Sequence, residues 1–318
     1  MTRKIATREA YGKALAELGK NNLRVVVLDA DLSKSTKTAD FAKVCPDRFF
    51  NMGVAEQNMI GTAAGLACAG KIPFASTFAV FAAGRAFDQI RNSVAYTKLN
   101  VKIAATHAGI TVGEDGGSHQ AIEDIALMRS LPNMVVFVPA DEAETRGAVQ
   151  AAADIDGPVY IRLGRMSAPP IHGEGFGFRP GKAEVVREGG QATVIAAGVM
   201  VSLALEAASA LSGEGIETRV ISMHTVKPLD VEAVIAAARE TGALVTAEEH
   251  SVIGGLGGAV SEVVCENYPV PVKRVGVRDT FGESGSPDEL MKKFGLTSSA
   301  IMEAVREVIK RKAISYKL

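Results

Sequence analysis

Short apolar runs alternate with longer segments in which apolar residues recur every three or four positions, and this pattern covers most of the chain. The short runs are rich in β-branched residues and apolar throughout, which is typical of strands buried on both faces of a parallel sheet. The longer segments have the spacing of helices that place one apolar face against such a sheet. The alternation therefore predicts an α/β fold with doubly wound parallel sheets.

The alternation occurs in two regions of the chain. In the first region, strands are expected over 24–28, 72–76, 102–106, 134–138 and 159–162, and helices over 56–69, 83–96 and 122–130. In the second region, strands are expected over 192–197, 218–222, 243–247 and 272–277, with helices around Glu206, Val234, Val260 and Ala304. The intervening stretch from Ser167 to Gly190 is rich in proline and glycine, as connectors are. We therefore expect one domain over residues 1–170, a linker over 171–190 and a smaller domain over 191–318.

The composition is that of a soluble globular protein, because 47% of the residues are apolar and 22% are charged. The formal net charge is −1, so no basic surface for nucleic acid or anionic membranes is expected. The N-terminus lacks the apolar segment of a signal peptide, and Gly198 and Glu206 interrupt the longest apolar stretch, 193–211. The three cysteines are scattered, which favours a reducing compartment over disulfides or a zinc site. We therefore expect a cytoplasmic protein.

Polar and aromatic residues gather just after several expected strands. Ligands of parallel α/β sheets bind beyond the carboxyl ends of the strands, so these residues are candidates for a binding site. They include Glu56 at a helix start, the pair Phe78 and Phe81, and two of the five histidines, His107 and His119. Each feature alone has an ordinary explanation, since acids favour helix starts and aromatic residues fill cores. Their order along the chain is what indicates a function.

Three segments carry a resemblance to a known family: Asn51-Met52-Gly53-Val54-Ala55-Glu56-Gln57, Thr77-Phe78-Ala79-Val80-Phe81 and Gly113-Glu114-Asp115-Gly116-Gly117-Ser118-His119-Gln120. In order, spacing and residue type they resemble the C-terminal half of transketolases, over nearly all of this chain. The resemblance implies a pyrimidine-binding domain followed by a smaller C-terminal domain. It also implies thiamine diphosphate as cofactor and transfer of a two-carbon ketol unit from a ketose phosphate to an aldose phosphate.

The resemblance implies a role for each candidate residue on the cofactor side. Glu56 matches the glutamate that hydrogen-bonds the cofactor's aminopyrimidine, and it is expected to be catalytic together with His119. Phe78 and Phe81 match the aromatic residues that stack on the pyrimidine ring. Asp31 matches an acid near the thiazolium ring. No metal ligand is expected in this chain.

On the substrate side, arginine suits a phosphate because its planar guanidinium can donate two hydrogen bonds to it. By resemblance, the phosphate would be bound by Arg8, Ser35 and Arg165. Contacts with the ketose hydroxyls and the reacting carbonyl are implied for His107, Asp115 and His119. A site built from such polar groups can discriminate sharply between sugars.

Two departures from the family pattern affect the expected assembly. Gly84 stands where several relatives have a third aromatic residue. The sequence also lacks the Gly-Asp-Gly segment, followed by asparagine, that holds Mg²⁺ and the diphosphate in this family. We therefore expect a partner subunit that corresponds to the N-terminal half, binds Mg²⁺ and shares the cofactor in an α2β2 assembly. Without it the chain should be inactive.

Several alternatives stay open on the sequence alone. The β subunit of a 2-oxoacid dehydrogenase shares the size and the segment Ala86-Phe87-Asp88-Gln89-Ile90, but not the sugar loop. A 1-deoxyxylulose-5-phosphate synthase shares the glycine loop and the glutamate, but is one long chain. A catalytically silent scaffold or regulatory homologue would not need Glu56, His107, Asp115 and His119. A nucleotide-binding oxidoreductase rests only on the glycines of 254–258, for which close helix packing is the expected reason.

Overall fold

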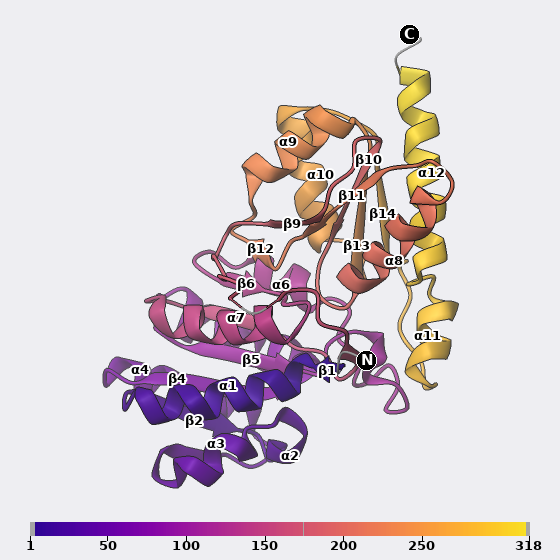
Figure 1. Cartoon of the computed structure of the whole chain (residues 1–318). Coiled ribbons are helices and arrows are strands. Elements are labelled where there is room, and N and C mark those ends of the chain that lie inside the picture. The colour runs from indigo at the N-terminus through magenta and orange to yellow at the C-terminus, as the bar shows by residue number, and fades with distance from the viewer. Residues whose placement is uncertain (1–3, 174, 316–318) are drawn as a thin grey trace.

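The computed structural model describes residues 4–173 and 175–315. The chain forms two α/β units, and Figure 1 shows the first, in indigo to magenta, below the second, in orange to yellow. A seven-stranded sheet forms the centre of the first unit and a five-stranded sheet the centre of the second. A short antiparallel pair, β1 (Ile5–Ala6) with β8 (Ser167–Ala168), joins the two ends of the first region.

The seven-stranded sheet has the order β12-β6-β7-β5-β4-β2-β3. Its strands are β2 (Val25–Asp29), β3 (Phe49–Asn51), β4 (Ile72–Phe78), β5 (Lys102–Thr106), β6 (Val135–Phe137), β7 (Val159–Arg162) and β12 (Thr225–Lys227). On one face lie α1 (Thr7–Asn21), α3 (Ala39–Val44) and α7 (Glu142–Asp154), and on the other lie α4 (Glu56–Cys68) and α6 (Asp124–Ser130). The strands pair in parallel, except that β12 pairs antiparallel with β6.

The five-stranded sheet has the order β14-β13-β10-β11-β9. Its strands are β9 (Glu184–Arg187), β10 (Ala192–Ala196), β11 (Thr218–Ser222), β13 (Leu244–Ser251) and β14 (Val272–Val277), and β9 is the antiparallel one. Helices α8 (Met200–Ser212) and α12 (Ser298–Ser315) cover one face, and α9 (Val231–Thr241) and α10 (Leu256–Asn267) cover the other (Figure 1). A shorter helix, α11 (Pro287–Lys293), follows β14.

These two mainly parallel sheets confirm the predicted fold class. The apolar stretch 193–211 forms β10, a turn at Gly198 and α8, and no helix in the described part of the chain is long and apolar enough to cross a membrane. The helix expected over 83–96 is instead a short α5 (Phe87–Gln89) between two π-helical segments, η2 (Phe81–Arg85) and η3 (Ile90–Ala95). Two antiparallel edge strands also differ from the expectation: β9 forms within the expected linker, and β12 crosses back to the first sheet.

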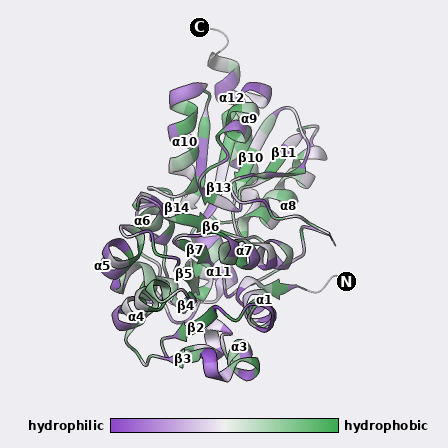
Figure 2. Ribbon diagram, turned by 90° about the vertical axis from the view of Figure 1, so that its left-hand side faces the viewer, coloured by the Kyte–Doolittle hydropathy of each residue, from purple (hydrophilic) through white to green (hydrophobic). Residues whose placement is uncertain are grey.

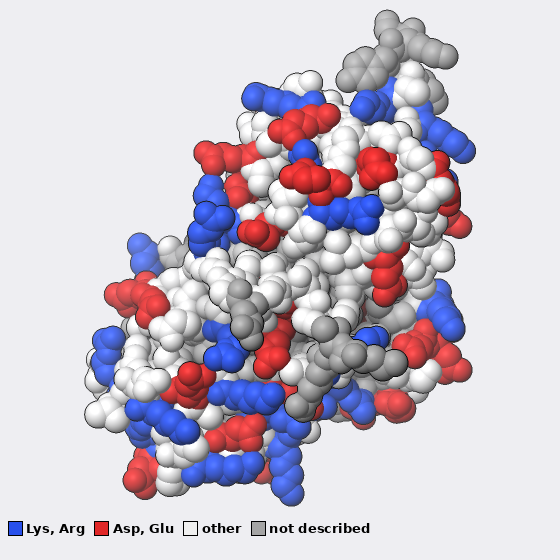
Figure 3. Space-filling model, in the orientation of Figure 1, with Lys and Arg blue, Asp and Glu red and all other residues white. Residues whose placement is uncertain are grey.

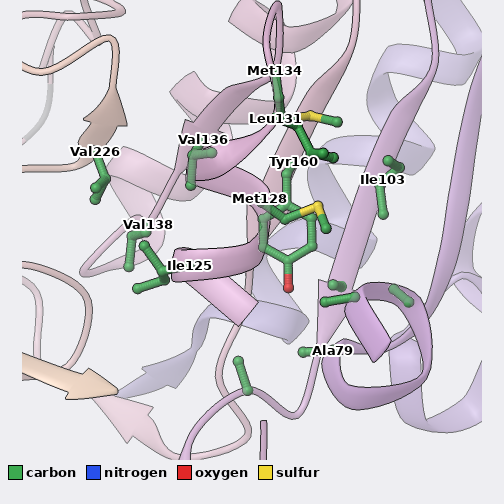
Figure 4. Close-up of a cluster of buried hydrophobic side chains, with 14 of the residues drawn as sticks. Ala79, Ile103, Ile125, Met128, Leu131, Met134, Val136, Val138, Tyr160 and Val226 are labelled. Carbon is green, nitrogen blue, oxygen red and sulfur yellow. The ribbon is translucent and has the colours of Figure 1, made fainter. Parts of the chain in front are cut away.

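One apolar core runs through the junction of the two units. Figure 4 shows Tyr160 among Met128, Leu131 and Met134, and the same cluster continues to residues of the second unit such as Ile195. The buried Tyr160 hydroxyl donates to Asp124 Oδ2 at 2.8 Å, so its polar group is satisfied. Hydropathy follows the same plan, with apolar strands inside each unit (Figure 2). The shared core holds the loops at the junction in defined positions.

The surface carries both signs of charge. On the face in Figure 3, Lys and Arg side chains are interspersed with Asp and Glu. This agrees with 35 basic and 36 acidic residues in the whole sequence. Any anionic ligand must therefore be bound by a few side chains rather than by a general field.

Candidate active site

The candidate residues lie where β2, β4 and β5 end, at the carboxyl edge of the first sheet. Phe78 is the last residue of β4, and His107 directly follows the last residue of β5. Glu56 is the first residue of α4 and is 2% exposed. The helix dipole favours an acid at this position, but a buried carboxylate is costly unless a further group pairs with it.

That partner is Arg85, a residue that the sequence analysis did not single out. Its Nη1 donates to both carboxylate oxygens of Glu56, each at 2.9 Å. The guanidinium carbon lies 4.3 Å from the centre of the Phe81 ring, as in a cation–π contact. Arg85 comes from the π-helical segment η2 and is 48% exposed, so one side of the ion pair faces solvent.

Four rings form a continuous wall beside Glu56, which we call the aromatic wall: Phe78, Phe81, His107 and His119. The Phe78 and Phe81 rings are stacked, with centroids 5.9 Å apart and an angle of 11° between the planes. His107 stacks on Phe78 at 3.9 Å, and His119 meets Phe81 edge-on at 5.3 Å. The structure thus brings together residues that are up to 41 positions apart in the sequence.

His107 is held by two hydrogen bonds that define its tautomer. Arg8 Nη1 donates to its Nε2 at 3.2 Å, so Nδ1 carries the proton and bonds Thr106 Oγ1 at 2.8 Å. Burial, followed by the nearby Arg8 and Arg165 charges, lowers the pKa of His107 to about 3. His107 is therefore neutral at physiological pH. Its backbone is left-handed, with φ of 56°.

The loop after β2 is shaped by the buried carboxylate of Asp29. It accepts hydrogen bonds from Leu32 N, Thr36 Oγ1 and Thr38 Oγ1 at 2.6 to 2.8 Å, and burial raises its pKa. Ser35 lies in the short helix α2 (Ser33–Thr36) that follows Leu32, and its carbonyl accepts a hydrogen bond from Arg8 Nη1 at 3.0 Å. Arg8, Ser35 and His107 therefore form one connected group.

Asp31 lies on the same loop but outside that group. It is exposed, has a left-handed backbone with φ of 64°, and accepts a hydrogen bond from Asn51 Nδ2 at 2.8 Å. Asn51 ends β3, the neighbouring edge strand. The bond joins two loops at the carboxyl edge of the sheet.

Residues 113–120, which we call the glycine loop, form the other side of the site. Arg165 donates to Val112 O and pairs with Glu114 Oε2 at 3.3 Å. His119 N donates to Gly116 O at 2.9 Å, which turns the loop toward the aromatic wall. Asp115 is exposed and makes no hydrogen bond or ion pair with the residues that the structure describes.

The glycine-rich stretch of the second unit is hydrogen-bonded to, and packed against, other parts of the protein. At the start of α10, Glu248 accepts hydrogen bonds from Leu256 N at 2.7 Å and Gly257 N at 2.8 Å. A Cβ on Gly257 would come within 2.8 Å of Thr246 Oγ1 and 2.9 Å of the Arg274 side chain. The prediction of close helix packing for these glycines is confirmed.

The first unit's site fits the pyrimidine half of a thiamine cofactor. It combines a buried carboxylate with an aromatic wall, and the partner of the carboxylate, Arg85, is a half-exposed side chain. Among the described residues there is no group of three or more His, Cys, Asp or Glu side chains that could hold a metal ion. The donor set thus suits an aromatic ring with a hydrogen-bonding nitrogen.

Comparison with known proteins agrees with this geometry. Residues 3–170 match the family "Transketolase, pyrimidine binding domain", and residues 181–301 match "Transketolase, C-terminal domain". The chain is 51% identical to a candidate transketolase C-terminal section of Methanocaldococcus jannaschii, over 96% of both proteins. It is 50% identical to a 6-deoxy-6-sulfo-D-fructose transketolase subunit of Clostridium sp. strain MSTE9, over 96% of this chain and 95% of that one.

Single-chain relatives are about twice as long. The chain is 43% identical to human transketolase over 96% of its own length, but spans 49% of that enzyme. A solved split-gene transketolase, described as an inactive β4 tetramer, superposes with a TM-score of 0.91 at 62% identity, over 97% of this chain and 99% of that chain.

Fold, glutamate and aromatic wall together define the pyrimidine-binding half of a thiamine-diphosphate enzyme. The chain belongs to the transketolase family and corresponds to the C-terminal section of a split transketolase. The pyrimidine-binding domain implies thiamine diphosphate as its cofactor.

Proposed function

We propose that this chain is the C-terminal subunit of a transketolase that moves a two-carbon ketol unit from a ketose phosphate to an aldose phosphate. The observation that carries the proposal is the buried Glu56 carboxylate beside the aromatic wall, with His107 and His119 in that wall. Phe81, a partly exposed ring of the wall, would offer a face for stacking, and Glu56 would offer a hydrogen-bond acceptor. Both are what an aminopyrimidine ring needs.

When bound, thiamine diphosphate would supply the nucleophilic carbon that breaks and forms the carbon–carbon bond. Glu56 would hydrogen-bond the pyrimidine ring, Phe78 and Phe81 would stack on it, and Asp31 would lie toward the thiazolium. Arg85 uses one acceptor site on each oxygen of Glu56, which leaves each oxygen a second site for a hydrogen bond with the ring. Glu56 would then hold or move a proton at its carboxylate oxygen.

On the substrate side, Arg8, Ser35 and Arg165 would bind the phosphate. Arg8 and Arg165 are close enough for each to perturb the same neighbour, His107, electrostatically. Neutral His107, together with Asp115 and His119, would contact the sugar hydroxyls and the reacting carbonyl. His119 lies against Phe81 and belongs to both the aromatic wall and the glycine loop.

The site in one chain is incomplete, which supports a requirement for a partner. The diphosphate and Mg²⁺ would be bound by an N-terminal-half subunit, and we propose an α2β2 assembly working in the cytoplasm. The similar split-gene transketolase is described as inactive in its β4 form, which agrees with this requirement. The three relatives described above are transketolases or sections of one, which favours this function over a 2-oxoacid dehydrogenase or deoxyxylulose phosphate synthase. The retained site disfavours a silent scaffold.

A second candidate differs in the sugar's anionic group. The relative at 50% identity is named for 6-deoxy-6-sulfo-D-fructose, whose sulfonate could also be bound by arginine. The chain should be co-purified with the product of any adjacent reading frame and assayed for ketol transfer with added cofactor. Parallel assays with ketose phosphates and with 6-deoxy-6-sulfo-D-fructose would identify the preferred donor. Absence of transfer from every ketose donor in the assembled complex would overturn the proposal.

A further inference from the structure

The second unit contacts the first through the carboxyl ends of its own strands. In doubly wound sheets this edge commonly binds a small ligand. Here β13 ends in Glu248, Glu249, His250 and Ser251, and all four take part in hydrogen bonds with protein. Three of these four residues bond to the first unit, in the region around the glycine loop.

Three bonds hold the chain on either side of the glycine loop. Buried Glu249 accepts from Thr111 N at 2.7 Å through Oε1. His250 Nε2 accepts from Ala126 N at 3.3 Å. Ser251 N donates to Ile122 O at 2.7 Å. The bonded residues thus lie just before the loop, at Thr111, and just after it, at Ile122 and Ala126.

Gly109 shows how closely Glu249 approaches the first unit. Its φ of +82° is in the left-handed region, and an added Cβ would lie 2.2 Å from Glu249 Oε1. A side chain at position 109 would therefore displace the carboxylate that holds Thr111. The close approach makes the bond dependent on glycine at this position.

The segment after β14, residues 279–286, lies directly against the glycine loop. Gln120 is buried, and its amide nitrogen donates to Glu283 O at 2.9 Å as well as to Ile110 O at 3.1 Å. A Cβ on Gly282 would lie 1.8 Å from Gln120 Oε1, and one on Gly117 would lie 2.7 Å from Gly282 O. Gln120 therefore bonds both units, in a space that leaves no room for a side chain at position 282.

We propose that the second unit is a positioning platform for the glycine loop: Glu249, Gly282 and Glu283 hold, through Thr111 and Gln120, the loop that carries Asp115 and His119. Gln120, Glu249 and Gly282 are positioning residues, since they reach the substrate only through that loop. The inference rests on the proposed function for its catalytic consequence, but not for the contacts themselves. It assigns the C-terminal domain an indirect part in sugar recognition, through the loop that it holds.

The first measurement uses the free full-length chain and needs neither cofactor nor partner. Amide hydrogen exchange is followed at Gly113, Gly116 and His119, whose N–H groups donate to the carbonyls three residues before them. Gln120→Met keeps the length of the side chain but removes its donors, and Gly282→Ala inserts a methyl group against Gln120. Gly190→Ala is the matched control, because an added Cβ there meets nothing within 4 Å. We expect exchange to accelerate about tenfold or more in the two test variants only, as local opening becomes easier.

The second measurement uses the chain assembled with its partner. In Gln120→Met and Gly282→Ala, kcat/KM for ketol transfer should fall by about 10- to 100-fold, while cofactor affinity stays within about twofold, because only the loop is displaced. Glu249→Gln retains an acceptor for Thr111 N and should keep most activity, whereas Glu249→Ala should lose it. A purely structural role would lower the melting temperature. It would not reduce kcat/KM at unchanged cofactor affinity, and Glu249→Gln would not retain activity that Glu249→Ala loses.

The outcomes separate the two proposals. Loop exchange unchanged in both test variants would overturn the platform, and so would loosened exchange with kcat/KM equal to that of Gly190→Ala. If the wild-type complex transfers no ketol unit while the variants loosen the loop, the proposed function fails and the positioning contacts stand. Should Gly282→Ala prove unstable, Gln120→Met decides the question.

Discussion

The two units share one plan, mainly parallel strands between helices, but the carboxyl edges of their sheets are used in different ways. At the first edge, the partner of Glu56 is Arg85, a side chain that is 48% exposed. At the second edge, Glu248 is bonded to the backbone N–H groups of α10, and Glu249 to that of Thr111. A side chain can leave its partner to admit a ligand, whereas a helix terminus cannot do so without unfolding. In this chain, the buried acid of the candidate site is the one whose partner is a half-exposed side chain.

The largest effect should come from Glu56. We expect Glu56→Gln or Glu56→Ala to lower kcat by roughly 10²–10⁴ in the assembled enzyme, the usual contribution of an acid–base group. Folding and assembly should survive. Glu142, which opens α7 as Glu56 opens α4, gives a matched control: Glu142→Gln should leave kcat unchanged. Near-normal turnover of the Glu56 variants at saturating cofactor would leave only a helix-start role.

The next effect separates binding of the phosphate from contact with the reacting carbon. Arg165→Ala should cost on the order of 1.5–3 kcal/mol of binding, mainly as a higher KM, because it removes a charged hydrogen-bond donor. The penalty should shrink for unphosphorylated substrates. His119→Ala should impair phosphorylated and unphosphorylated substrates alike. Measuring kcat/KM for both variants on both substrate types is the test, and equal penalties for Arg165→Ala would refute its phosphate role.

His107 predicts an acid sensitivity of the first edge. Its pKa is lowered to about 3 in the folded chain, so the unfolded chain binds the proton more readily between about pH 6.5 and pH 3. Above pH 6.5, His107 takes nothing from the free energy of unfolding. As the pH falls from 6.5 toward 3, this free energy decreases, by about 2 kcal/mol at pH 5.

Denaturant unfolding of the free chain at pH 7 and pH 5 checks this for wild type and His107→Asn. Asparagine is suitable because it tolerates the left-handed backbone at this position. The variant should lose about 2 kcal/mol less than wild type between the two pH values. An identical pH dependence in both proteins would contradict the account of His107.

The smallest effect is expected for Glu248, at the second edge. Glu248→Ala leaves two N–H groups at the start of α10 without their acceptor and should lower the free energy of unfolding by about 1–2 kcal/mol. Its kcat and cofactor affinity should match those of wild type at 25 °C, because Glu248 contacts neither substrate nor cofactor. A loss of kcat comparable to that of Glu56→Gln would contradict the assignment of a structural role to Glu248.

Much of the fold could be predicted from the sequence because the signals are local. The expected strand 102–106 is β5, and 159–162 is β7. Each is a short continuous run of buried residues, and such a run is recognisable from its own sequence. Antiparallel β12 could not be predicted, because its three residues join a sheet whose other strands end at residue 162. The π-helical segments around α5 were missed for a similar reason, since their apolar spacing resembles that of an α-helix.

In the candidate site, too, residues in local sequence patterns could be predicted, whereas their distant partners could not. Glu56, Phe78 and His119 could be singled out as candidates because they stand in continuous segments with recognisable order. Arg85 was missed because nothing in the linear pattern pairs it with a carboxylate 29 positions away. The bond from Gln120 to Glu283 spans 163 positions, and only the folded chain brings these residues together. Partners that hold a site in place are therefore harder to predict than the residues that face the ligand.

The central claim is that this chain carries half of a catalytic site, and one titration tests it most directly. Thiamine diphosphate with Mg²⁺ is titrated into the purified chain alone and into the chain with its N-terminal-half partner, while ketol transfer is followed in both. The account predicts weak cofactor binding and no turnover for the chain alone, and tight binding with turnover for the complex. Full activity of the purified chain without a partner would contradict it.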